Sequence, residues 1–97
     1  MFQSQCEEGK LRVAFSGRMD TTQSTAIQEE LLARVTATPL PVVFDLKDVE
    51  FVASAFLRLC LSTAQRVGAN RLTLANASPA VRKVFAIAGL DRHFHME

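Results

Sequence analysis

The sequence contains no tryptophan and no tyrosine, and it has only two cysteines, two histidines and four glycines. Because seven phenylalanines are its only aromatic residues, we expect them to supply all of the aromatic volume of the core. The glycines stand singly, which excludes a Gly-rich phosphate loop and disfavours a nucleotide-dependent enzyme. Cys6 and Cys60 are far apart in the chain, and we expect both to be small buried hydrophobic residues rather than a disulfide pair.

The residues present also argue against metal-dependent and hydrolytic chemistry. His93 and His95 would share one face of a strand, but no third ligand accompanies them at metal-binding spacing. A serine nucleophile needs a nearby histidine and acid, and both histidines lie close to the C-terminus. We therefore predict no metal, no cofactor and no enzymatic activity.

The chain has no long apolar run and no block of like charges. Eleven Lys and Arg residues balance ten Asp and Glu residues, which argues against a nucleic-acid or anionic-membrane surface. No apolar stretch approaches the ~18 residues that span a bilayer, and residues 1–10 lack the features of a signal peptide. From 97 residues, 48% of them hydrophobic, we predict a single domain over residues 1–97, a cytoplasmic location and no direct membrane insertion.

Periodicity and turn residues predict an alternation of strands and helices. The strand candidates, recognised by alternating or continuous apolar residues, are residues 2–7, 11–17, 42–46 and 71–75. The helix candidates, recognised by apolar spacing and by caps, lie between Asp20 and Pro39, over 55–67 and over 78–89. We expect residues 2–7 to be an edge strand joined to the next through a turn at Gly9-Lys10, and Val42–Leu46 to be a central strand covered on both faces. Residues 93–97 are either a last strand or a frayed end. This order predicts an α/β fold with a mixed four- to five-stranded sheet and helices mainly on one face.

Two longer segments follow the motifs of a known family. Residues 43–57, VFDLKDVEFVASAFL, are similar to a strand followed by D-L-x-x-V-x-F-[IV]-D-S-[ST]-G-L, and residues 76–91, NASPAVRKVFAIAGLD, are similar to the family's loop and last helix. Gly17–Asp20 resembles its G-x-[LI]-D turn before the first helix. On these segments the chain resembles the STAS family, the domains of anti-sigma factor antagonists that also occur in stressosome proteins, anion transporters and lipid-transport complexes. The sequence departs from the family pattern at three positions, which are Ala53, Ala55 and Phe56.

The resemblance implies a protein-interaction switch. In antagonists of this family, the serine of the D-S-[ST]-G position is phosphorylated by a partner that is both anti-sigma factor and serine kinase, and only the unphosphorylated form binds that partner. By position this phosphoacceptor is Ser54, and a phosphatase acting on Ser54 would reverse the switch. Two alternatives stay open: a STAS structural subunit of a lipid-transport or stressosome assembly without a phosphate cycle, and a nucleotide- or ligand-binding sensor domain.

The surface around Ser54 can be outlined from helical spacing. Ser54 lies where a strand turns into a helix, so its hydroxyl is either an N-cap or an exposed phosphoacceptor at a helix N-terminus. Phe56 should face the core, Leu57 and Leu61 should lie at the edge of the core stripe, and Arg58 should be exposed one turn from Ser54. Asp20 joins this surface if the first helix begins nearby. The predicted partner-binding residues are Asp20, Ala53, Ser54, Ala55, Leu57, Arg58, Leu61 and Ser62.

Overall fold

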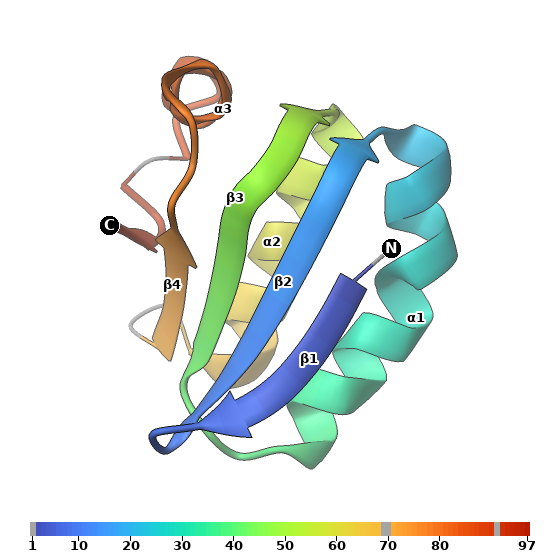
Figure 1. Ribbon diagram of the computed structural model, residues 1–97, viewed down its shortest axis with the longest axis vertical. Coiled ribbons are helices and arrows are strands. Elements are labelled where there is room, and N and C mark those ends of the chain that lie inside the picture. The colour runs from blue at the N-terminus through green and yellow to red at the C-terminus, as the bar shows by residue number, and fades with distance from the viewer. Residues whose placement is uncertain (1, 69–70, 91) are drawn as a thin grey trace.

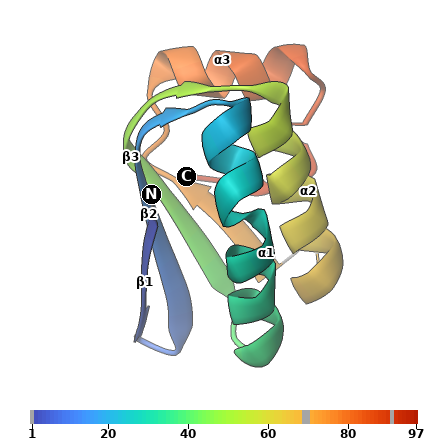
Figure 2. The ribbon, with the colours of Figure 1, turned by 90° about the vertical axis from the view of Figure 1, so that its right-hand side faces the viewer.

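The computed structural model describes residues 2–68, 71–90 and 92–97, in which a five-stranded mixed sheet carries two helices on one face (Figures 1 and 2). The strands lie side by side in chain order, and they are β1 (Phe2–Glu7), β2 (Lys10–Met19), β3 (Val42–Val52), β4 (Leu72–Ala75) and β5 (His95–Met96). β1 is antiparallel to β2, and all other neighbours are parallel. The helices are α1 (Thr21–Ala37), α2 (Ser54–Val67) and α3 (Pro79–Ile87). α1 and α2 pack side by side, while α3 lies across one end of the sheet (Figure 2). The predicted α/β architecture is confirmed.

The N-terminal hairpin forms as predicted, with two differences in its bounds. The turn is made by Glu8 and Gly9, whose φ values of 54° and 75° are both positive, rather than by Gly9 and Lys10. A two-residue turn of this kind matches the twist of the strands that it joins, and glycine adopts it without strain. β2 also continues past Gly17 to Met19, because its end pairs with the far end of β3.

β3 is the central strand, as predicted, but it is longer than expected and its second half is irregular. Between the pairs Ala14–Asp45 and Met19–Val52, β2 advances five residues while β3 advances seven, so β3 bulges at two places. On the face toward the core, the spacing of the buried side chains changes from two residues to three, and these side chains are Val42, Phe44, Leu46, Val49 and Val52. The prediction that both faces of Val42–Leu46 are covered is confirmed in part, because Val43 on the second face is buried whereas Asp45 is only half-buried.

The helices begin and end close to the predicted residues. At the start of α3, the Ser78 Oγ accepts a hydrogen bond from the Val81 N–H at 3.2 Å, and Pro79 occupies the first helical position. α2 ends at Gly68, whose φ of 97° is a value that favours glycine. Within the described residues, no helix combines the length and the apolar character needed to cross a bilayer.

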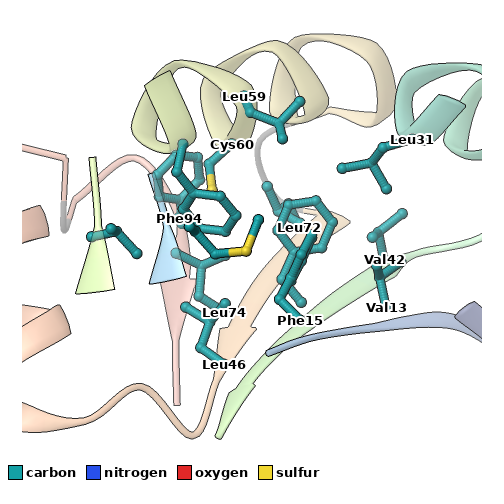
Figure 3. Packing of buried hydrophobic residues seen from close by; sticks show 14 of the residues in the cluster. Val13, Phe15, Leu31, Val42, Leu46, Leu59, Cys60, Leu72, Leu74 and Phe94 are labelled. Atoms are coloured by element: carbon teal, nitrogen blue, oxygen red, sulfur yellow. The ribbon is translucent and has the colours of Figure 1, made fainter. Parts of the chain in front are cut away.

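Phenylalanine side chains fill the centre of the core between the sheet and the helices (Figure 3). The Phe15 ring makes edge-to-face contacts with the rings of Phe44 and Phe56, with centroids 4.9 Å and 5.1 Å apart. Cys60 lies in the same core, where burial raises the pKa of its thiol and keeps it protonated and unreactive. The prediction that Cys6 is buried is wrong, since it lies exposed near the end of the edge strand β1.

Candidate functional site

The carboxyl ends of β2 and β3 bring two helix N-termini together. Met19 lies opposite Val52, and the Ala53 N–H donates a hydrogen bond to the Met19 carbonyl at 3.0 Å. Asp20 and Ser54 follow these paired residues directly, so α1 and α2 begin next to each other at one end of the sheet (Figure 2). Asp20 is therefore a neighbour of Ser54 in space, which was the condition for including it in the predicted surface.

Asp20 is the N-cap of α1. Its Oδ1 accepts a hydrogen bond from the Gln23 N–H at 2.9 Å, and its carbonyl accepts one from the Ser24 N–H at the same distance. The carboxylate stabilises the partly positive helix N-terminus and stays half-exposed. One negative charge is thus already present beside Ser54 before any modification.

The capping interpretation of Ser54 is wrong. Ala53 is the N-cap of α2 and has no side-chain oxygen, while its carbonyl accepts hydrogen bonds from the N–H groups of Phe56 and Leu57 at 2.9 Å and 3.3 Å. Ser54 is instead the first helical residue and is exposed, and its hydroxyl makes no hydrogen bond to any other residue that the structure describes. The hydroxyl is therefore accessible at a helix start that lacks a side-chain cap.

Several predicted partner-binding residues line the outer side of the first turns of α2. We call this surface the α2 face, and it consists of Ser54, Ala55, Arg58, Leu61 and Ser62. Ser54 and Arg58 are exposed and the other three are half-buried. The Arg58 guanidinium has no ion pair or hydrogen bond with the described residues, so its charge is available to a partner. Leu57 is only 8% exposed and packs in the core, and Ala53 is half-buried beneath the helix start, so neither extends the exposed surface.

Two further side chains near Ser54 were missed by sequence reasoning. Phe51 is 38% exposed and therefore adds little to the core, and the guanidinium carbon of Arg18 lies 4.5 Å from the centroid of its ring. The two residues are register partners at the ends of β3 and β2. A cation over an aromatic face is a stabilised and still accessible arrangement. The bulges of β3 turn Phe51 outward, and no sequence periodicity signals them.

Asp45, the first residue of the D-L motif, has a structural role below the site. It accepts hydrogen bonds from the Arg12 guanidinium at 2.9 Å, the Asn76 amide at 3.1 Å and the Lys47 N–H at 3.0 Å. Partial burial raises the pKa of Asp45, but the hydrogen bonds from Asn76, Lys47 and Arg12 and the charge of Arg12 outweigh it, so the net pKa is lowered. The bond to Lys47 falls at the first bulge. Asp45 therefore stabilises the irregular part of β3 that leads to Ser54.

The terminal histidines do not form a metal site with their neighbours. Within the described part of the chain, no three His, Cys, Asp or Glu side chains gather closely enough to hold a metal ion. His95 Nε2 lies 4.0 Å from a carboxylate oxygen of Glu97, with both side chains largely exposed, and His93 is also exposed.

Comparison with known proteins agrees with this arrangement. The family model described as "Mlab, STAS domain" matches residues 2–96. The anti-sigma-F factor antagonist RsfB of Mycobacterium tuberculosis is 25% identical over 85 residues, which cover 87% of this chain and 70% of RsfB.

Asp91, the last residue of the second motif, lies outside the described residues.

Two solved structures have the same fold. The anti-sigma factor antagonist SpoIIAA of Bacillus superposes over the whole chain and 88% of its own length in the unphosphorylated form, with a TM-score of 0.83 at 22% identity. A chain of the Acinetobacter MlaFEDB complex superposes over 96% of this chain and 98% of its own length, with a TM-score of 0.74 at 20% identity. The match of the family model to nearly the whole chain, together with this fold, shows that the chain belongs to the STAS domain family, which includes anti-sigma factor antagonists.

Proposed function

We propose that this chain is an anti-sigma factor antagonist that works as a phosphorylation switch through Ser54. The observation that carries the proposal is the exposed Ser54 hydroxyl, which has no hydrogen bond within the described residues and lies where α1 and α2 begin together. The similarity to RsfB, an anti-sigma-F factor antagonist, and the existence of SpoIIAA in phosphorylated and unphosphorylated forms support it. The unmodified α2 face binds an anti-sigma factor that is also a serine kinase, and a phosphatase acting on Ser54 restores binding.

The charges around Ser54 explain how a phosphate would act. A phosphoserine carries a charge of about −1.5 to −2 at neutral pH, and it would stand beside the Asp20 carboxylate. Before modification, the unpaired Arg58 is available to an acidic group of the partner. After modification, the same guanidinium lies one helical turn away and can fold back onto the phosphate in a charge-assisted hydrogen bond. The single modification therefore adds negative charge and withdraws a positive contact.

Binding measurements with variants of Ser54 test this function. The partner is a candidate serine-kinase anti-sigma factor from the same organism, and binding is followed by calorimetry. Ser54→Ala should bind as wild type does but should no longer accept phosphate, whereas Ser54→Asp should bind at least about tenfold more weakly, a change of ~1.4 kcal/mol. Gln65→Glu, which adds one charge near the far end of the same helix, should leave binding unchanged and serves as the control. Equal binding of Ser54→Asp and wild type would remove the phosphate switch.

A second function uses the same surface without phosphorylation. Structural similarity to a chain of the MlaFEDB complex and the description of the matching family model favour a permanent subunit of a lipid-transport assembly. Ala53 and Ala55, which replace the acidic and hydroxyl residues usual in the phosphorylated motif, are consistent with it. Intact-mass analysis of the protein from its own host separates the two functions. A gain of one phosphate mapped to Ser54 supports the switch, and unmodified protein that co-purifies with transport subunits supports the assembly.

A further inference from the structure

The outer face of α3 exposes apolar and basic side chains only. In the nine residues Pro79–Ile87, Val81 and Phe85 are buried against the core. The exposed residues are Pro79, Ala80, Arg82, Lys83, Ala86 and Ile87. Ile87 is 76% exposed, and it is one of the two large apolar side chains that are exposed in the described part of the chain. A helix on the surface of a soluble protein normally turns polar residues toward water.

The other two helices follow that rule, which makes α3 the exception within the same molecule. α1 exposes residues such as Gln28 and Glu29, and all of its large apolar side chains are buried. α2 exposes residues such as Arg58 and Gln65, and none of its large apolar side chains is exposed. Polar residues thus stand where α1 and α2 meet water. The apolar outer face of α3 therefore indicates a surface that a partner covers.

The charge on this face has one sign. Arg82 and Lys83 are its only ionisable residues, and residues 76–90 contain no Asp or Glu. Arg82 donates a hydrogen bond to the backbone oxygen of Glu97 at 3.2 Å. Lys83 makes no ion pair or hydrogen bond with the described residues, and it lies one helical turn from Ile87 on the same side of α3. A partner that buries Ile87 must therefore also meet a positive charge, and a carboxylate is the group that complements it.

We propose that the outer face of α3 binds an acidic amphipathic helix of a partner protein. The partner's apolar side chains would cover Ile87, and its carboxylates would pair with Lys83 and Arg82. Helical spacing places Ala80 beside Ile87, and the small side chain of Ala80 allows a second helix to approach closely. α3 is about 13 Å long, which is enough to contact about two turns of a crossing helix. The surface contains neither Ser54 nor the α2 face, so the inference goes beyond the proposed function and does not depend on it.

Two other occupants fit these observations less well. A second copy that packed α3 against α3 would bring two Lys83 charges together, and no other helix of the described chain combines acidic residues with an exposed large apolar side chain. A membrane would be contacted by one large apolar side chain, Ile87, and by the two cations of α3, in a chain whose net charge is only +1. Helices that lie on anionic membranes have a broad apolar face and a polar face rich in Lys and Arg. A partner protein with an acidic helix is therefore the occupant that the charges favour.

Binding of a designed helical peptide to the full chain tests this inference. The probe is a fluorescently labelled peptide of about 18 residues, with leucines at i, i+3, i+4 and i+7 spacing and glutamates on either side of them. In a matched peptide, lysines replace the glutamates. Fluorescence anisotropy should show that the chain binds the glutamate peptide at least about tenfold more tightly than the lysine peptide. Equal binding of the two peptides, or no binding of the glutamate peptide up to about 1 mM, overturns the proposal.

Variants of the chain locate the binding on α3. Ile87→Gln and Lys83→Glu should each weaken binding of the glutamate peptide about tenfold or more. Their circular dichroism should stay that of wild type, because both side chains are exposed. Lys10→Glu makes the same charge change at the hairpin turn, at the opposite end of the molecule from α3 (Figure 1), and should leave binding unchanged. Equal binding by wild type, Ile87→Gln and Lys83→Glu overturns the proposal.

Two measurements without the peptide test the other occupants. Co-sedimentation of wild type with vesicles of phosphatidylcholine and phosphatidylglycerol that is lost in Ile87→Gln would assign this face to a membrane. Sedimentation velocity that gives the mass of two chains for concentrated wild type and of one chain for Ile87→Gln would assign it to a second copy. Either result overturns the proposal, whereas a wild type that binds the glutamate peptide and shows neither behaviour supports it.

Discussion

Phe56 stands where relatives of this family usually have glycine, and its removal should be among the most destabilising single changes in the chain. Its side chain has no exposed surface, and its ring contacts the Phe15 ring edge-to-face at 5.1 Å with an interplanar angle of 86°. Replacing a fully buried phenylalanine by alanine typically costs ~3–5 kcal/mol, of which ~0.5–1.5 kcal/mol comes from such an aromatic pair. Since small domains are stable by only ~5–15 kcal/mol, Phe56→Ala should lose a large part of the free energy of unfolding.

Urea denaturation followed by far-ultraviolet circular dichroism measures this loss, because the absence of tryptophan rules out the usual fluorescence signal. The matched control is Phe51→Ala, which removes the same side chain five residues earlier, where it is 38% exposed and contacts Arg18. We expect the control to cost about 1 kcal/mol or less, from the lost cation–π contact and a little burial. If Phe56→Ala costs no more than Phe51→Ala, then Phe56 is not a core residue and its place in the motif belongs to partner binding instead.

Three further changes have defined outcomes. Asp45→Asn should lower the free energy of unfolding by ~1–3 kcal/mol at neutral pH, because it removes the ion pair with Arg12. Because the pKa of Asp45 is lower in the folded than in the unfolded protein, its charge stabilises the fold above the unfolded pKa of 3.8, and this stabilisation is lost as the pH falls through the folded pKa. Urea titrations near pH 3 should therefore show a smaller difference in the free energy of unfolding between Asp45→Asn and wild type than at neutral pH. A difference that does not change with pH would contradict the ion pair. Arg58→Ala should weaken binding of the kinase partner about tenfold in calorimetry while changing stability by less than ~0.5 kcal/mol, and unchanged affinity would move the docking surface away from α2. Ser78→Ala should cost ~1 kcal/mol in a thermal melt through loss of the α3 cap, and no shift would mean that water replaces it.

The helices of this chain could be predicted closely because their signals are local. Proline and glycine stop α1 and α2, serine followed by proline starts α3, and a rotation of about 100° per residue correctly placed Phe56 in the core. The parallel order of β2, β3 and β4 follows from the intervening helices. These features depend only on residues near one another in the chain.

The errors have a different physical origin, since each depends on contacts between distant residues. The second half of β3 contains two bulges that depend on pairing with β2, and they turn Phe51 outward against any regular period. Cys6 looks like a core residue by type, but its position near the end of an edge strand exposes it. The N-cap of α2 is one residue earlier than predicted, because the Ala53 N–H is held by the carbonyl of Met19. That single-residue difference leaves the Ser54 hydroxyl without a capping bond.

The two bulges in β3 also affect how a partner can approach. Bulged strands twist and bend more than regular ones, and the carboxyl ends of β2 and β3 curve over toward the starts of α1 and α2 (Figure 2). Ser54 follows the bulged end of β3 after two residues, and Arg18 and Phe51 are register partners near the ends of β2 and β3. The bulges therefore bring the exposed ring of Phe51, with the Arg18 guanidinium over it, to the same end of the sheet as the exposed Ser54 hydroxyl.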